Sequence, residues 1–135
     1  MAAAPPPHMD VRDAVEADAD RLAALTGSPR DVMRNLVHDR TVRVAVVDEE
    51  IEGFVSYDAR AETVHITQLE GNGEVCDRLL DEPVRFARTE GMDVELLVPD
   101  DETNTREAAE AAGFERAGSG PAFEGQPTVR YRFDP

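Results

Sequence analysis

Three neighbouring runs in the middle of the chain alternate apolar and polar residues. They cover residues 41–47, 51–59 and 63–70, and short polar turns separate them. A two-residue period places one set of side chains on a buried face, as in a β-strand. Because turns of this length join antiparallel neighbours, the pattern predicts a three-stranded antiparallel meander.

Four other segments carry apolar residues at the helical period, at 16–27, 28–40, 74–91 and 104–114. Ser28 followed by Pro29 is typical of a cap and a first helical residue, so we expect Ser28 to cap the second helix. Thr103 or Asn104 is expected to cap the fourth helix. Pro83 lies inside the third and is expected to kink it, because proline removes one hydrogen bond of the helix.

Shorter apolar runs predict four more strands, at 9–15, 92–99, 115–118 and 128–133. The last two runs flank a connection rich in glycine and proline, residues 119–127. The predicted element order is therefore β-α-α-β-β-β-α-β-α-β-β, in the fold class α+β or α/β. A strand, a helix and a strand over 63–98 imply a right-handed parallel crossover. We expect a mixed, mostly antiparallel sheet flanked by helices.

Length and composition limit the class of protein. The chain has 135 residues, of which 41% are hydrophobic, and this favours a single globular domain over 9–135. Residues 1–8, MAAAPPPH, are typical of a disordered tail, with Met9 as the possible natural start. The sequence has no apolar run near the roughly 18 residues of a membrane helix. Its single cysteine, Cys76, excludes an internal disulfide. These features favour the cytoplasm and predict no membrane partner.

The charge balance is strongly acidic. Asp and Glu number 29 against 14 basic residues, all of them arginine, so the formal net charge is −15. A chain this acidic repels nucleic acid and anionic membranes, so neither is expected as a partner. The acids are spread along the sequence, which favours adaptation to a salt-rich cytoplasm where ions screen the self-repulsion. An acidic patch for a cationic partner is the alternative interpretation.

Four stretches, taken in order, resemble the GNAT superfamily of acetyl-CoA-dependent N-acetyltransferases. They are VRDAVEADADRLAAL, VAVVDEEIEGFVSY with Gly53, VHITQLEGNGEVCDRLLDEPVRFARTEGMDVELLV, and REAAEAAGFERAG with Gly113-Phe114. Together they cover most of residues 9–133. The likeness lies in the ordered set, and it implies a single GNAT-like acyltransferase domain.

The resemblance implies where a cofactor binds. In this family two neighbouring strands diverge, and the pantetheine arm of acetyl-CoA pairs with the edge of the fourth strand. The pyrophosphate meets free amides at the start of the third helix. The two strands correspond here to 63–70 and 94–98. The implied cofactor-binding residues are Leu69, Gly71, Asn72, Gly73, Val75 and Asn104. No metal is implied.

The family's phosphate loop can be aligned with this chain in two ways. The stretch QLEGNG, residues 68–73, has the family's spacing of a glutamine or arginine and two glycines. Alternatively, the leucines at 79–80 align with the family's paired helix leucines. Val75 then lies between the two glycine positions, the loop is several residues shorter, and Gln68 belongs to the strand.

The expected phosphate site carries negative charge. There is no basic residue between 61 and 77, while Glu70 and Glu74 lie beside the expected pyrophosphate. Two carboxylates within about 6 Å would oppose it by roughly 1 kcal/mol or more. Glu74 also has a structural explanation, since an acid in the first turn of a helix offsets the helix dipole.

Acyl transfer to an amine needs a base or a water for the amine proton and an acid for the leaving thiolate. Many GNAT members carry a tyrosine where this chain has Ala109. Tyr131, on the last strand, is a candidate for that acid. Glu62 and His65, beside or on the fourth strand, are candidate bases. Cys76 lies on the apolar side of its helix and is interpreted as a buried thiol.

Two functions follow from these residues. The first is an acetyl-CoA-dependent N-acyltransferase acting on a small-molecule or protein amine. The second is a GNAT-like module that has lost acyl transfer and serves in binding, sensing or dimerisation. An unrelated α/β domain with the same element order is a third interpretation. The apolar and aromatic last strand, 128–133, is a possible homodimer contact.

Overall fold

The computed structural model describes residues 9–123 and 125–135, so the predicted tail at 1–8 lies outside the described residues. In chain order the elements are β1 (Met9–Asp13), the one-turn 3-10 helix η1 (Glu16–Asp18), α1 (Ala19–Thr26), α2 (Arg30–Asp39), β2 (Thr41–Val47), β3 (Glu50–Arg60), β4 (Thr63–Glu70), α3 (Gly73–Glu90), β5 (Asp93–Pro99), α4 (Thr103–Ala111), β6 (Glu115–Phe123) and β7 (Gln126–Phe133). The strands form one sheet in the order β1-β2-β3-β4-β5-β7-β6. The predicted element order and fold class are confirmed, with η1 as an addition.

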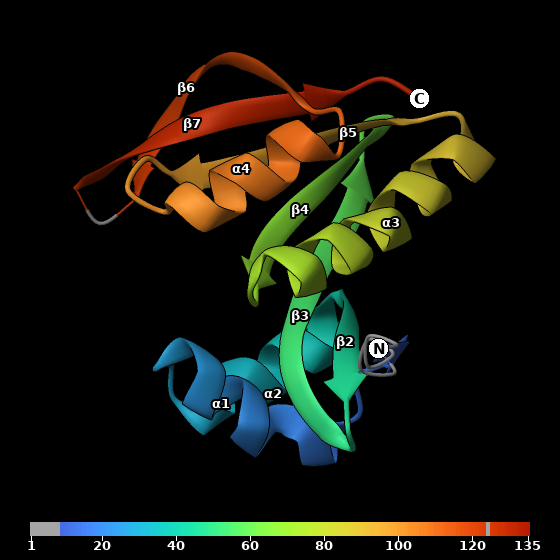
Figure 1. The fold of residues 1–135 in the computed structure, drawn as a ribbon, viewed down its shortest axis with the longest axis vertical. Coiled ribbons are helices and arrows are strands. Elements are labelled where there is room, and N and C mark those ends of the chain that lie inside the picture. Colours follow the sequence, from blue (N-terminus) through green and yellow to red (C-terminus); the bar gives the residue numbers. More distant parts are fainter. Residues whose placement is uncertain (1–8, 124) are drawn as a thin grey trace, which may run out of the picture.

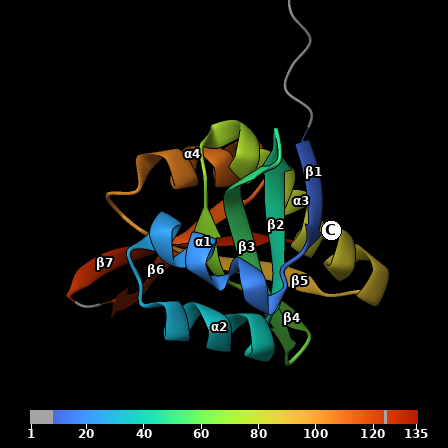
Figure 2. The same ribbon diagram turned by 90° about the horizontal axis from the view of Figure 1, so that it is seen from below.

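The helices cover the two faces of the sheet (Figures 1 and 2). α3 and α4 pack on one face and bury the larger apolar cluster, which includes Leu79, Leu96 and Tyr131. α1 and α2 pack on the other face over β2 and β3, where the smaller cluster includes Leu22 and Phe54. β5 alternates buried and half-buried residues along its length because successive side chains of a strand point to opposite faces.

The predicted meander and crossover are both present. β2, β3 and β4 pair in antiparallel fashion in chain order. α3 then connects β4 to β5, and these two strands run parallel, with Thr63 opposite Asp93 and Ile66 opposite Leu96. α3 continues through Pro83 as one helix, and Pro83 is buried.

The predicted cap of α2 is wrong by one residue. α2 begins at Arg30, and Pro29 occupies the cap position that the sequence suggested for Ser28. The carbonyl of Pro29 accepts hydrogen bonds from the amides of Val32 and Met33, at 3.1 and 3.2 Å. Because a carbonyl already serves these amides, the helix starts without a side-chain cap.

The predicted cap of α4 is also wrong. Glu102 occupies the cap position, so Thr103 and Asn104 lie inside the helix, and Glu102 makes no capping hydrogen bond through its side chain. The turn before α4 is already tight, because the amide of Thr103 donates to the carbonyl of Asp101 at 3.0 Å.

The connection predicted at 119–127 is mostly strand. β6 runs to Phe123, with two shifts of register against β7. β6 is an edge strand, and edge strands accept glycine, proline and bulges that central strands do not. Thr128 of β7 donates through its hydroxyl to the carbonyl of Pro121 at 2.8 Å, which holds this irregular strand in place.

Candidate functional site

The parallel pairing of β4 and β5 stops part-way along both strands. Ile66 and Leu96 are the last paired residues, although both strands continue beyond them. From there β4 pairs with β3 and β5 pairs with β7, and β4 turns away from β5 (Figure 1). Residues 67–70 and 97–99 are therefore not paired with one another. We call the space between these two segments the gap.

A β-bulge at Thr67 accounts for the divergence. Ile66 lies opposite Tyr57 of β3, whereas Gln68 lies opposite Ser56, so Thr67 is an extra residue on β4. The hydroxyls of Thr67 and Ser56 are 2.6 Å apart, and the Thr67 hydroxyl lies 3.2 Å from the Ser56 carbonyl oxygen that accepts its hydrogen bond. A bulge bends a strand and increases its twist, which moves the end of β4 away from β5.

The start of α3 is packed tightly against β3. Asn72 caps the helix, because its Oδ1 accepts a hydrogen bond from the Val75 amide at 2.9 Å. Val75 is 2% exposed. A Cβ added to Gly53 or to Gly71 would lie 2.5 Å from Val75 Cγ1. Glycine at both positions therefore lets the β4–α3 connection approach β3, and Gly71 also has a φ of 137° that favours glycine.

Two carboxylates flank the open end of the gap, which we call the mouth. Glu70 ends β4 and Glu102 precedes α4. Burial raises the pKa of Glu70, a hydrogen bond with Gln68 lowers it, and the charge of Glu102 raises it further. Burial likewise raises the pKa of Glu102, with a contribution from Asp101. The mouth therefore opposes the gain of further negative charge.

Cys76 packs beneath the mouth as a protonated thiol. It is fully buried, and its Sγ donates to the carbonyl of Gly71 at 3.3 Å. Burial raises the pKa of Cys76 to about 11, and Glu70, Asp77 and Glu102 add to the rise. A thiolate is the reactive form of cysteine, so this thiol is no nucleophile at neutral pH. The interpretation as a buried thiol is confirmed.

The hydroxyl of Tyr131 is hydrogen-bonded to side chains of α4. Its side chain is fully buried, and its hydroxyl donates to Glu110 Oε2 at 2.6 Å. Arg106 Nε donates to the same hydroxyl at 3.5 Å. Burial and the bond to Glu110 raise the pKa of Tyr131, whereas Arg106 lowers it. The phenolic proton therefore already has a protein acceptor.

His65 belongs to a row of polar and ionisable residues that crosses the sheet. Its cross-strand partners are Asp58 on β3 and Glu95 on β5. Arg40 forms an ion pair with Asp58, and Arg132 forms one with Glu95 at 3.8 Å. His65 precedes the buried Ile66, so the row lies on the face opposite α3 and α4.

Glu62 lies far from the gap. It belongs to the exposed turn between β3 and β4, with a φ of 66°, and its carbonyl accepts a hydrogen bond from the Asp93 amide at 3.3 Å. β4 runs from this turn toward the mouth, so the length of a strand separates Glu62 from the open end.

The implied cofactor-binding residues gather at the two sides of the mouth. Those on the β4–α3 side are Leu69, Gly71, Asn72, Gly73 and Val75, and Asn104 lies in the first turn of α4. Leu69 and Val75 are buried in the apolar cluster, whereas the other four residues are exposed. Sequence reasoning missed Thr67 and Glu102, which shape the gap and charge its mouth.

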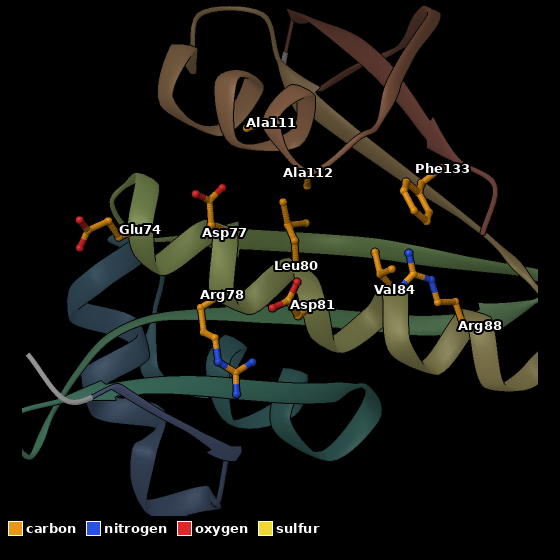
Figure 3. Close-up of a pocket in the computed structure, with 10 residues that line it drawn as sticks. All are labelled: Glu74, Asp77, Arg78, Leu80, Asp81, Val84, Arg88, Ala111, Ala112 and Phe133. Atoms are coloured by element: carbon orange, nitrogen blue, oxygen red, sulfur yellow. The ribbon is translucent and has the colours of Figure 1, made fainter. Parts of the chain in front are cut away.

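A shallow groove of about 610 Å³ runs between α3 and the end of α4 (Figure 3). Leu80, Val84, Ala111, Ala112 and Phe133 form its apolar part, and Glu74, Asp77, Arg78, Asp81 and Arg88 line it with charge. Figure 3 shows Asp77 directed toward α4. The α3 side of this groove is therefore mostly acidic near the mouth.

Within residues 9–123 and 125–135, no three His, Cys, Asp or Glu side chains come together in a group that could hold a metal ion. The helices in this described part are all too short or too polar to cross a membrane.

Solved structures similar to this chain include acetyltransferases. An N-acetyltransferase from Staphylococcus aureus Mu50 has a TM-score of 0.78 at 10% identity, with 94% of this chain and 97% of that chain covered. A ribosomal-protein-alanine N-acetyltransferase from Brucella melitensis has a TM-score of 0.75 at 17% identity, with 92% and 98% covered. An acetyltransferase of the GNAT family from Streptococcus pneumoniae has a TM-score of 0.69 at 17% identity, with 93% and 99% covered. The chain has the GNAT fold. No protein-family model and no curated protein matches the sequence.

Within the GNAT fold, the structure distinguishes the two alignments of the phosphate loop. Gln68 lies inside β4 opposite Ser56, and only Gly71 and Asn72 connect β4 to α3. This agrees with the alignment in which the loop is shortened and Gln68 belongs to the strand. The literal match of residues 68–73 therefore does not mark a complete phosphate loop.

Proposed function

We propose that this chain is an N-acyltransferase that takes an acyl group from a thioester and transfers it to an amine. The observation that carries the proposal is the end of β4–β5 pairing at Ile66 and Leu96, which leaves two diverging strand segments. The GNAT fold of the neighbours supports it, because three are named as acetyltransferases. Acetyl-CoA is the expected donor, and the expected acceptor is a small-molecule or protein amine.

The gap suits the pantetheine part of such a donor. Residues 67–70 and 97–99 are not paired with one another, so backbone groups along their facing edges are available to an extended ligand. An added strand of this kind gains main-chain hydrogen bonds. The pyrophosphate part of acetyl-CoA fits less well, because the Val75 amide is taken by Asn72 and the mouth carries Glu70 and Glu102.

The bound thioester would supply an activated carbonyl: a C–N bond forms, the C–S bond breaks, the amine loses a proton and the sulfur gains one. Cys76 takes no covalent part, because its thiol is buried and its pKa is raised to about 11. The transfer is therefore direct. Tyr131 and His65 stay predictions for the proton transfers, and the position of Glu62 in the β3–β4 turn makes it the weakest candidate.

A non-catalytic module is the second candidate. Ala109, where many family members have tyrosine, is fully buried and supplies no proton. The hydroxyl of Tyr131 is bonded to Glu110. A protein that binds a thioester without transferring its acyl group would have this arrangement.

Melting in the presence of donors tests the proposal. A ligand that binds only the folded state at about ten times its Kd stabilises by roughly 1.4 kcal/mol and should raise Tm by about 3–6 °C. We expect such a rise with acetyl-CoA or S-acetylpantetheine in roughly 2–3 M KCl, which screens the repulsion between the acidic residues. Release of free thiol with a panel of amines then measures transfer.

Each outcome of this experiment separates the candidates. A rise in Tm together with thiol release supports the acyltransferase. A rise without release from any amine supports the non-catalytic module. No rise with either thioester at about 1 mM excludes the acyltransferase and leaves only a module that binds no thioester. The matched control is pantetheine without an acyl thioester, which should bind in the gap but release no additional thiol.

A further inference from the structure

The start of α3 offers an anion fewer free amides than an uncapped helix does. The first four amides of a helix ordinarily have no helical partner. Here the Val75 amide, one of these four, donates to Asn72 Oδ1 at 2.9 Å, and the Cys76 amide makes the first ordinary bond of the helix, to the Asn72 carbonyl at 2.8 Å. The side-chain oxygen of Asn72 thus takes one hydrogen bond that a bound anion could otherwise accept at the helix start.

The mouth also lacks a countercharge. The sequence has no basic residue between 61 and 77. Among the described residues nearby, Arg78 lies 3.4 Å from Glu82, and Arg106 donates to the Asp100 carbonyl at 3.0 Å. Both guanidinium groups are therefore engaged by other parts of the chain.

The negative charges of the two mouth carboxylates, Glu70 and Glu102, influence each other and the same neighbouring thiol. The charge of Glu102 raises the pKa of Glu70, and both carboxylates raise the pKa of the Cys76 thiol. Glu70 is the last residue of β4, and Glu102 follows the end of β5; because these two strands run parallel, both residues lie at the same end of the gap. An anion at this end would meet two negative charges with no arginine to offset them.

We propose that the donor site binds a thioester through its uncharged pantetheine arm alone, while Glu70, Glu102 and Asn72 disfavour a pyrophosphate at the mouth. This inference rests on the proposed function. It makes Glu70 and Glu102 specificity-determining residues for the donor. Thioesters of pantetheine bind more tightly than thioesters of CoA at low salt, and the difference shrinks as salt screens the mouth.

Calorimetric titration of S-acetylpantetheine and acetyl-CoA, from the lowest KCl concentration at which the protein stays folded up to about 3 M, tests this. At the low-salt end we expect acetyl-CoA to bind about tenfold more weakly than S-acetylpantetheine. Its affinity should rise with KCl, whereas phosphate sites built on positive charge weaken with salt. The affinity of S-acetylpantetheine should change less than about threefold over the same range.

The double variant Glu70→Gln with Glu102→Gln keeps the shape of the mouth and removes its charge. It should bind acetyl-CoA about tenfold more tightly at low salt and S-acetylpantetheine within about threefold of the original chain. The matched control is Glu90→Gln with Glu115→Gln. These exposed residues end α3 and begin β6, away from the mouth, and their replacement changes the net charge equally.

Three results overturn the inference. Acetyl-CoA binding more tightly than S-acetylpantetheine at low salt would do so while leaving the proposed function intact. Equal gains in acetyl-CoA affinity in the mouth variant and in the control would show a general charge effect instead. Binding of neither thioester at any salt would remove the proposed function and this inference together. Even if the variants fold poorly, the comparison of the two thioesters on the unaltered chain at low salt can still overturn the inference.

Discussion

Single side chains at the gap are adapted to packing more than to chemistry. Val75 fills the space between Gly53 and Gly71, and a Cβ on Gly53 would lie 2.3 Å from the Glu70 carbonyl oxygen. Cys76 lies beside Val75 with its thiol protonated and bonded to a backbone carbonyl. The residues that the family resemblance assigns to a cofactor therefore also hold α3 against β3.

The reactivity of Cys76 offers a direct test of this packing. Because burial raises its pKa to about 11, almost none of the thiol ionises at pH 7–8, and little reagent can reach it. We expect a thiol-specific disulfide reagent to label the folded chain at least about 100-fold more slowly than the same chain unfolded in guanidinium chloride, with labelling speeding up only as the pH approaches about 11. Rapid stoichiometric labelling of the folded chain at pH 7 would contradict the burial.

Among secondary-structure elements, α3 and β4 decide the shape of the site. α3 is capped by Asn72, and β4 is bent by the bulge at Thr67. Both features are local in the chain, but they act together: the bulge opens the gap, and the short connection brings the helix start to its mouth.

Replacement of the cap measures how strongly α3 is fixed at the mouth. Asn72→Ala should lower the free energy of unfolding by about 0.5–2 kcal/mol, because the Val75 amide loses its acceptor. Asn72→Gly should lower it by only a few tenths of a kcal/mol. Denaturant unfolding at high salt measures both. An Asn72→Ala variant as stable as the original chain would contradict the role of Asn72 as the cap.

In the chain as a whole, charge is the dominant property. Ion pairs such as Arg12 with Asp18 at 2.8 Å and Arg43 with Asp13 at 3.1 Å use part of the 14 arginines. The remaining excess of acids leaves a net charge of −15 on 135 residues. Such a charge favours solubility but destabilises the compact state by self-repulsion unless salt screens it.

Salt should therefore stabilise the fold. We expect Tm to rise by more than about 10 °C between roughly 0.1 and 2 M KCl, since the Debye length falls from about 10 Å to less than about 3 Å. Sodium chloride at the same ionic strength should act similarly if screening is the cause. A Tm that falls or stays constant over this range would contradict the interpretation as adaptation to high salt.

The sequence by itself determined the elements and their order, because they depend on short-range patterns. The two-residue period of 41–70 predicts the meander, and the glycines at 27 and 91 follow the predicted helices as they follow α1 and α3. The bulge is also visible in the sequence, because the two-residue alternation of Val64 and Ile66 is interrupted: the next apolar residue of the cluster is Leu69, not residue 68. Local chain chemistry is enough for such features.

Only the tertiary structure decided where the gap begins and what surrounds its mouth. The gap begins where pairing stops at Ile66 and Leu96, on two strands that are separated in the sequence by the whole of α3. Glu102 lies at the same end of the gap as Glu70 only because α4 begins after β5 ends, and Tyr131 bonds to Glu110 only because β7 packs near α4. These contacts depend on register and on helix docking across long stretches of chain, and no local spacing of residues encodes them.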